Sequence, residues 1–167
     1  QSVLEELAIP VESQVVVFSP TSFQAKLISP ENPRAIYFAD NVAVAWVRGG
    51  DVLEVAASDP QSGVAFYTLD QSESDKPLFK RRNDCLRCHL SQDTLDLPGM
   101  LVQSTAVEQR IVSDHRTPLT QRWGGWYVTG VSRRFRHMGN RVGQGWIKSL
   151  YDQFETTGYP TLYSDIV

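Results

Sequence analysis

Between residues 35 and 69, short apolar runs alternate with small groups of turn-forming residues. Each run has the length of a strand, and the groups between them, among them Asp40-Asn41 and Gly49-Gly50-Asp51, are typical of tight turns. This pattern predicts an antiparallel β-meander. Its strands are expected at Ala35 to Ala39, Val42 to Val47, Val52 to Ala57 and Val64 to Leu69.

The pattern outside the meander is less regular. Segment 70–84 is polar and is predicted to be a loop. The remaining apolar stretches predict three further strands and two short helices. The strands are expected at Gln14 to Phe18, Met100 to Ser104 and Trp126 to Val131, and the helices at Val3 to Ala8 and Gly145 to Phe154.

Length and charge limit the possible classes of protein. A chain of 167 residues that is 41% hydrophobic is predicted to form one domain, residues 1–167, around one core. Its net charge of -3 gives no field that would favour nucleic acid. The longest apolar run, Val42 to Val47, is far shorter than the roughly 20 residues that cross a bilayer, so we expect no transmembrane segment.

The most informative motif is Cys85-Leu86-Arg87-Cys88-His89. It contains both cysteines of the chain and one of its three histidines. Two thiols one turn apart can each bond a haem vinyl group, and the adjacent imidazole can then ligate the iron as the proximal ligand. The motif therefore predicts one covalent c-type haem, held by Cys85 and Cys88 and ligated by His89.

Other uses of the two cysteines fit less well. A disulfide between Cys85 and Cys88 would close a very short loop and stabilise the chain little. A thioredoxin-like pair is expected between a strand and a helix of a βαβ unit, which the surrounding sequence does not resemble. A closed zinc site needs four ligands, and the chain has no second cysteine pair. Two unrelated core thiols are the remaining alternative.

The haem motif also bears on location. Bacterial c-type haem attachment takes place outside the cytoplasmic membrane, so we expect an exported, periplasmic or extracellular protein. The start Gln1-Ser2-Val3 would suit a chain from which a signal peptide has been removed.

Several stretches resemble a little-characterised family of exported bacterial mono-haem c-type cytochromes with one CxxCH motif. The resemblance runs from about residue 15 to the end and brings no known activity with it. Members of that family continue past the equivalent of Ser164 to Val167 into a helical region, which implies that this chain is processed or truncated. The stretches are NPRAIYF within residues 28–38, VAFYTL at 64–69, WGGWYVTG at 123–130 and RHMGN at 136–140.

The predicted fold class is α+β. It comprises an antiparallel β-meander, short helices, and a loop or helix that carries the haem. By analogy of fold, this arrangement resembles the PAS-like haem domains of some exported bacterial sensors. It differs from the small all-helical cytochromes c.

The sixth ligand of the iron would decide between electron transfer and ligand binding. Met100 is the first candidate because the Pro98-Gly99 turn could fold it round the haem edge. The alternatives are His137, His115 and Met138. Each has a plainer interpretation, since a Met beside aliphatic residues commonly fills a core and a His beside charges is commonly solvated.

Other residues are candidates for haem contacts. Arg81 and Arg82, and the cluster Arg133-Arg134-Phe135-Arg136, could pair with haem propionates, although each could equally form a solvated face. Trp126 could pack on the porphyrin, since aromatic rings bury a large area.

The leading functional hypothesis is one-electron transfer to a redox partner protein or complex, by a protein that is not itself an enzyme. A haem-based redox or gas sensor is the second hypothesis, and a peroxidase is the third.

Overall fold

The computed structural model describes residues 2–100, 103–106, 109–112, 116–128, 136–142 and 145–146. The chain forms two compact units, and the expectation of one domain stays a prediction. Unit 1 is Gln1–Gln14 with Pro20–Leu101, and unit 2 is Val15–Ser19 with Val102–Val167. Each unit is described by itself.

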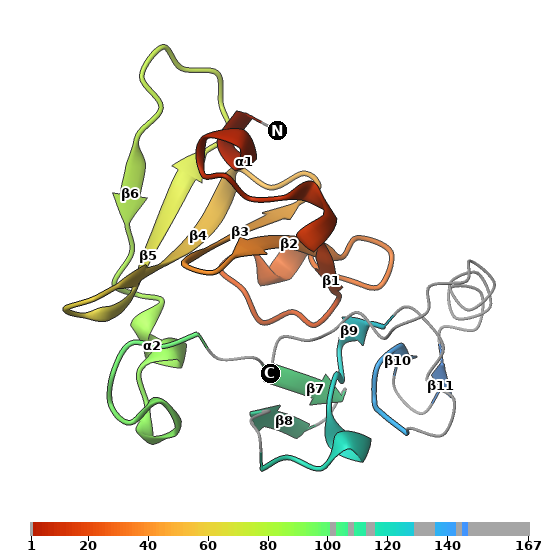
Figure 1. The fold of residues 1–167 in the computed structure, drawn as a ribbon. Coiled ribbons are helices and arrows are strands. Elements are labelled where there is room, and N and C mark those ends of the chain that lie inside the picture. The colour runs from red at the N-terminus through yellow and green to blue at the C-terminus, as the bar shows by residue number, and fades with distance from the viewer. Residues whose placement is uncertain are drawn as a thin grey trace. The chain divides into compact units, whose positions relative to one another are not determined.

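Unit 1 is built on an antiparallel sheet whose strands follow the order β6-β5-β4-β3-β2 (Figure 1). The predicted meander is confirmed, and the strands extend the predicted ranges by at most two residues at either end. The chain is mostly antiparallel β-structure with a few short helices, as expected for an α+β meander. The strands are β2 Arg34–Ala39, β3 Val42–Val47, β4 Val52–Asp59, β5 Gly63–Asp70 and β6 Phe79–Arg81.

Strand β6 corrects the prediction of a loop over residues 70–84. It pairs with β5 through the partners Leu69 and Phe79, Thr68 and Lys80, and Tyr67 and Arg81. All of its residues are exposed, so it shows no alternation of buried and exposed positions. Backbone hydrogen bonds to β5 form this edge strand without a hydrophobic pattern in the sequence.

Alternate residues of the meander lie on its two faces, and the register shows which residues share a face. Tyr37, Val44, Val55 and Tyr67 lie side by side across β2 to β5. Val44 and Val55 are buried there against Ile9. We call this the closed face, because the N-terminal segment of the same chain covers it.

We call the other side the polar face. It carries Glu54 and Thr68, which are direct partners on β4 and β5, and Phe66, which pairs with Ala56 two positions further along. Arg34 of β2 reaches Glu54 across the intervening strand. The polar face thus combines a charged pair with an aromatic ring.

The short helices of unit 1 lie outside the sheet. Helix α1, Ser2–Glu6, confirms the helix predicted at Val3 to Ala8, and it ends before Ala8, whose φ is 52°. Helix α2, Leu86–His89, contains the end of the cysteine motif. The 3-10 helices are η1 Val11–Ser13, η2 Ala25–Leu27 and η3 Gln92–Thr94.

The described residues of unit 2 form three antiparallel pairs of strands and one 3-10 helix. Its strands β1 and β9 confirm part of the strands predicted at Gln14 to Phe18 and Trp126 to Val131. The pairs are β1 Val15–Val17 with β9 Trp126–Tyr127, β7 Gln103–Ala106 with β8 Gln109–Val112, and β10 Arg141–Val142 with β11 Gly145–Trp146; the 3-10 helix is η4 Leu119–Gln121.

Two predictions for this region need correction. The strand expected from Met100 to Ser104 begins at Gln103, and Met100 lies outside it. The helix expected from Gly145 to Phe154 begins instead as strand β11, in which Trp146 pairs with Arg141. Residues 147–154 lie outside the described residues.

None of the helices in the described part of the chain has the length and apolar character that crossing a bilayer requires.

Candidate functional site

One helical turn brings the two cysteines and His89 together. Cys85 occupies the N-cap of α2, and its carbonyl accepts hydrogen bonds from the backbone N–H groups of Cys88 and His89 at 3.1 and 3.2 Å. Both cysteines are thiols in this structure. The spacing on which the sequence prediction depends is therefore realised as one turn that begins at Cys85.

The ring of His89 is fixed by two contacts. It packs on Phe66 of the polar face with ring centroids 4.6 Å apart, and its Nδ1 lies 2.9 Å from the carbonyl oxygen of Gly99. The backbone N–H of Gly99 also donates to the carbonyl of His89 at 2.9 Å. His89 and Gly99 are thus joined through both the ring and the backbone.

The hydrogen bond to Gly99 determines the tautomer of His89. A carbonyl oxygen only accepts, so Nδ1 must carry the proton and Nε2 presents a lone pair. Burial lowers the pKa of His89, and the charge of Arg34 acts in the same direction, although the Gly99 carbonyl and Glu54 oppose it. The neutral ring with a free Nε2 lone pair is the form that ligates a metal.

The loop that carries Gly99 is anchored to the sheet. The backbone N–H of Val64, at the start of β5, donates to the carbonyl of Pro98 at 2.9 Å. A Cβ atom on the preceding Gly63 would lie 2.3 Å from the same oxygen. Glycine at position 63 therefore permits the approach that places Gly99 beside His89.

The same loop exposes an unusual amount of apolar surface. Leu95 is 84% exposed, and its φ of 56° places it in the left-handed region. Four exposed apolar side chains within eleven residues form a segment that water alone would solvate poorly, which is typical of a binding surface. They are Leu90, Leu95, Leu97 and Met100.

Cys85 does not have the electrostatics of an attacking thiol. Burial raises the pKa of Cys85, and the negative charges of Asp84 and Glu54 act in the same direction. An attacking cysteine of a thioredoxin-like motif needs a lowered pKa. Among the described residues, no group of three or more His, Cys, Asp and Glu side chains could hold a metal ion. The raised pKa of Cys85 weighs against the thioredoxin alternative.

The two arginines that precede the motif are placed differently from each other. Arg82 forms two hydrogen bonds with the carboxylate of Asp84, at 3.0 and 2.6 Å, and its guanidinium lies 4.2 Å from the ring centroid of Phe23. Arg81 is exposed on β6, where it is the partner of Tyr67 and thus shares the closed-face register. Arg81 therefore lies on the closed-face side of β6, whereas Arg82 donates its backbone N–H to the carbonyl of Phe66 at 2.8 Å and its guanidinium is already paired with Asp84.

The structure also shows a charged pair that sequence reasoning missed. Arg34 Nη1 lies 3.2 Å from Glu54 Oε2, with side-chain exposures of 15% and 18%. A sequence signal existed, since both are charged residues within apolar strands at positions that share one face. Phe66 and Gly99 had no comparable signal beyond the Pro98-Gly99 turn.

The remaining ligand candidates lie in unit 2 or outside the described residues. His137 is buried, its Nδ1 accepts a hydrogen bond from the Gly139 N–H at 3.0 Å, and its ring is T-shaped against Trp123. In a neutral ring this puts the proton on Nε2, the reverse of His89. Met138 is half-buried. His115, Arg133 and Arg134 lie outside the described residues.

Trp126 is buried in unit 2. The backbone beside it is hydrogen-bonded to the side chain of Asn140. The Asn140 side chain accepts from the N–H of Val128 at 2.9 Å and donates to its carbonyl at 2.8 Å. The backbone N–H of Asn140 also donates to the carbonyl of Trp126 at 2.9 Å. The WGGWYV and HMGN stretches are therefore tied together by a fully buried amide. The contact predicted between Trp126 and haem stays a prediction.

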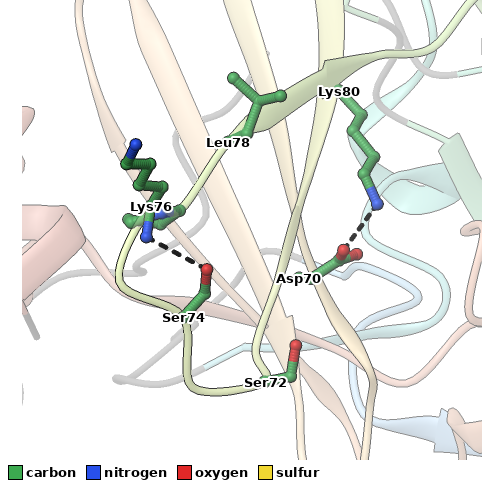
Figure 2. Close-up of a pocket in the computed structure, with 7 residues that line it drawn as sticks. Asp70, Ser72, Ser74, Lys76, Leu78 and Lys80 are labelled. Atoms are coloured by element: carbon green, nitrogen blue, oxygen red, sulfur yellow. Dashed lines mark hydrogen bonds and ion pairs between the residues drawn. The ribbon is translucent and has the colours of Figure 1, made fainter.

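A separate cavity of about 200 Å³ lies in the loop between β5 and β6 (Figure 2). Lys80 Nζ and Asp70 Oδ2 form an ion pair of 2.6 Å beside it, and the Ser74 hydroxyl accepts from the N–H of Lys76. Both members of the ion pair are about half exposed, and such pairs contribute little free energy. We assign no chemistry to this cavity.

No protein-family profile, curated protein sequence or solved structure matches the chain.

Proposed function

We propose that this protein carries one c-type haem, bonded to the thiols of Cys85 and Cys88, with His89 as the proximal ligand. The observation that carries the proposal is the 2.9 Å hydrogen bond from His89 Nδ1 to the Gly99 carbonyl. It leaves Nε2 as the ligand atom, one helical turn from two thiols. A ligating histidine characteristically donates its other ring N–H to such a carbonyl.

The residues around the motif fit this group. Phe66 supports the His89 ring from the sheet, so the imidazole cannot rotate freely. The exposed leucines after the motif supply the apolar surface that a porphyrin would cover, which would stabilise them by roughly 25 cal/mol per Å². Haem iron supplies reversible exchange of one electron when bound.

On this basis the protein is a one-electron carrier that exchanges electrons with a redox partner protein or complex in the periplasm or outside the cell. The chain's part is to fix the ligand tautomer and to set the polarity around the iron. A PAS-like sheet with haem held by α2 and its loop is the corresponding fold proposal. It is supported by the antiparallel meander, whose polar face meets the His89 ring.

Expression with a bacterial c-type maturation system tests the attachment. The denatured protein should retain haem, and its mass should exceed that of the chain by one haem. The variants Cys85→Ala and Cys88→Ala should each lose one thioether bond, and the double variant should lose covalent haem altogether. A denatured wild-type protein without haem would overturn the proposal.

One observation favours a second function, a haem-based redox or gas sensor. Gly99 is bound to the Nδ1 edge of the His89 ring, and Met100 is its neighbour in the chain. The backbone of Met100 is thus held away from Nε2, on the His89 side, whereas a sixth ligand must approach from the far side of the haem. This placement favours an open or weakly held distal position.

Spin state separates the two functions. Should Met100 ligate the iron, the reduced protein is low-spin and the Met100→Ala variant becomes high-spin and binds carbon monoxide. With an open distal position, the wild type is already high-spin and binds the gas, and Met100→Ala leaves both properties unchanged.

A further inference from the structure

In the charged pair on the polar face, Glu54 uses more of its hydrogen-bonding capacity than Arg34 does. Both Glu54 oxygens are used, since Oε1 accepts from the backbone N–H and the side-chain amide of Gln24 at 3.3 Å and Oε2 accepts from Arg34 Nη1 at 3.2 Å. Arg34 has five N–H donors but makes this single hydrogen bond among the described residues. Its Nε is fully buried and has no hydrogen-bond partner within the described part of the chain.

An orphaned donor on a buried guanidinium is costly. A buried N–H without a partner has lost its hydrogen bonds to water and gained none in return, and the loss is larger on a charged group. Burial lowers the pKa of Arg34, and the charge of Glu54 only partly compensates. The Arg34 Nε–H therefore lacks one hydrogen-bond acceptor. Because the guanidinium is positively charged, an anion is the acceptor that fits it best.

Arg34 and Glu54 lie close to the proposed haem site. Glu54 shares the polar face with Phe66, because their partners Thr68 and Ala56 place the two side chains at diagonal positions of β4 and β5. Phe66 carries the His89 ring. The charges of both Arg34 and Glu54 also act on the His89 ring. The orphaned Nε therefore belongs to the same face as the motif.

We propose that Arg34 binds a carboxylate of the haem, one of its two propionates, through the unpaired Nε–H. This inference rests on the proposed haem attachment. A guanidinium presents its donors as a planar fork that matches a carboxylate, and Glu54 holds the fork in place from its other edge. Arg34 thus has the role, pairing with a haem propionate, that the sequence suggested for Arg81 and Arg82.

The geometry of the other two arginines supports this assignment. Arg82 already forms a bidentate pair with Asp84 and stacks on Phe23. Arg81 is exposed and shares the closed-face register. Of the three, Arg34 combines burial, an unpaired donor and the polar face.

The test is resonance Raman spectroscopy of the propionate bending mode, together with the haem content of the denatured protein. Arg34→Lys keeps the charge and removes the Nε–H. We expect haem at wild-type stoichiometry, a shifted propionate band and a lower midpoint potential. Arg81→Lys is the matched control and should leave the band and the potential unchanged.

A second pair of variants avoids leaving Glu54 buried without its partner. Glu54→Gln retains Arg34 and should keep the wild-type propionate band, whereas Arg34→Gln combined with Glu54→Gln should shift it. Attached haem with an unshifted band in both Arg34 variants would overturn the role of Arg34 and leave the haem proposal intact. Wild-type protein without covalent haem would overturn the haem proposal itself.

Discussion

The two faces of the meander in unit 1 differ in the residues they carry and in what covers them. On the closed face, Val44 and Val55 pack on Ile9, and partly buried Leu4 and Leu7 extend the cluster. The chain covers this face with its own N-terminal segment. The polar face also buries an aliphatic side chain, Val47, which is the sheet partner of Arg34. It carries in addition a charged pair and the His89 ring, and the loop beside that ring leaves four apolar side chains exposed.

The difference shows which face the chain covers and hydrogen-bonds by itself. The closed face buries aliphatic side chains against each other, which stabilises a fold without any further component. On the polar face the buried Arg34 Nε has no partner among the described residues, and the loop that follows α2 leaves its leucines in water; both features cost free energy. A ligand with a flat apolar body and carboxylates would remove both costs. The polar face is therefore the one that a haem would complete.

The largest expected effect comes from removing the aromatic ring of the polar face. Phe66 is 7% exposed and supports His89. Phe66→Ala should lower the free energy of unfolding by about 3–5 kcal/mol, because a buried aromatic ring leaves a large cavity. Denaturant titration measures the loss. Phe66→Leu, which fills more of the space, is the control, and equal losses in both variants would contradict a cavity effect.

The next effect tests the link between the sheet and the loop. Gly63 has a φ of 84°, and an added Cβ would lie 2.3 Å from the Pro98 carbonyl. Gly63→Ala should cost about 2–3 kcal/mol, from the left-handed conformation and from displacement of the loop.

This substitution should also disturb the hydrogen bond from His89 Nδ1 to the Gly99 carbonyl and so change the haem spectrum. Gly49→Ala is the matched control, since Gly49 also has a positive φ but a Cβ there would meet nothing within 4 Å. A haem spectrum that responds equally to both substitutions would break the proposed link.

A smaller effect is expected from the closed face. Val44 is 2% exposed, and Val44→Ala should cost about 2 kcal/mol through lost transfer free energy and a small cavity. The haem spectrum and the propionate band should stay at their wild-type positions, because Val44 lies on the other side of the sheet. Thermal unfolding and optical spectra of one sample measure both. A spectral shift in Val44→Ala would show that the faces are coupled.

The sequence predicted those features that local patterns encode. The four meander strands follow from strand-length apolar runs separated by turn residues, and His89 follows from a motif of five residues. Strand β6 gave no signal, since Phe79 to Arg81 are exposed on both sides and only backbone pairing with β5 defines them.

The rest of the site depends on contacts between distant residues. Arg34 and Glu54 are 20 residues apart, and their pairing requires the register of three strands. The hydrogen bond of His89 with Gly99 likewise depends on how the loop returns to β5. A single sequence shows which residues are charged or flexible, but the register decides which of them meet.

The smallest effect concerns the turn that joins β4 to β5, where both faces end. Asp59 Oδ1 accepts from the backbone N–H groups of Gln61 and Ser62 at 2.9 and 2.7 Å. Hydrogen bonds from the Ser62 side chain and from these two N–H groups hold the pKa of Asp59 below its ordinary value. This half-buried residue contributes to the turn and to neither face.

The sign of the resulting pH dependence follows from the lowered pKa. A carboxyl group whose pKa is depressed by folding adds stability above its ordinary pKa of about 4, and this stability is lost as the pH falls through the folded value. Asp59→Asn keeps an acceptor oxygen but does not titrate, so its melting temperature should match the wild type more closely at pH 3 than at pH 7. The haem spectrum should stay unchanged at neutral pH. An equal difference between the two proteins at both pH values would show that the charge of Asp59 does not support the turn, whereas a spectral change would extend the influence of the turn to the His89 ring.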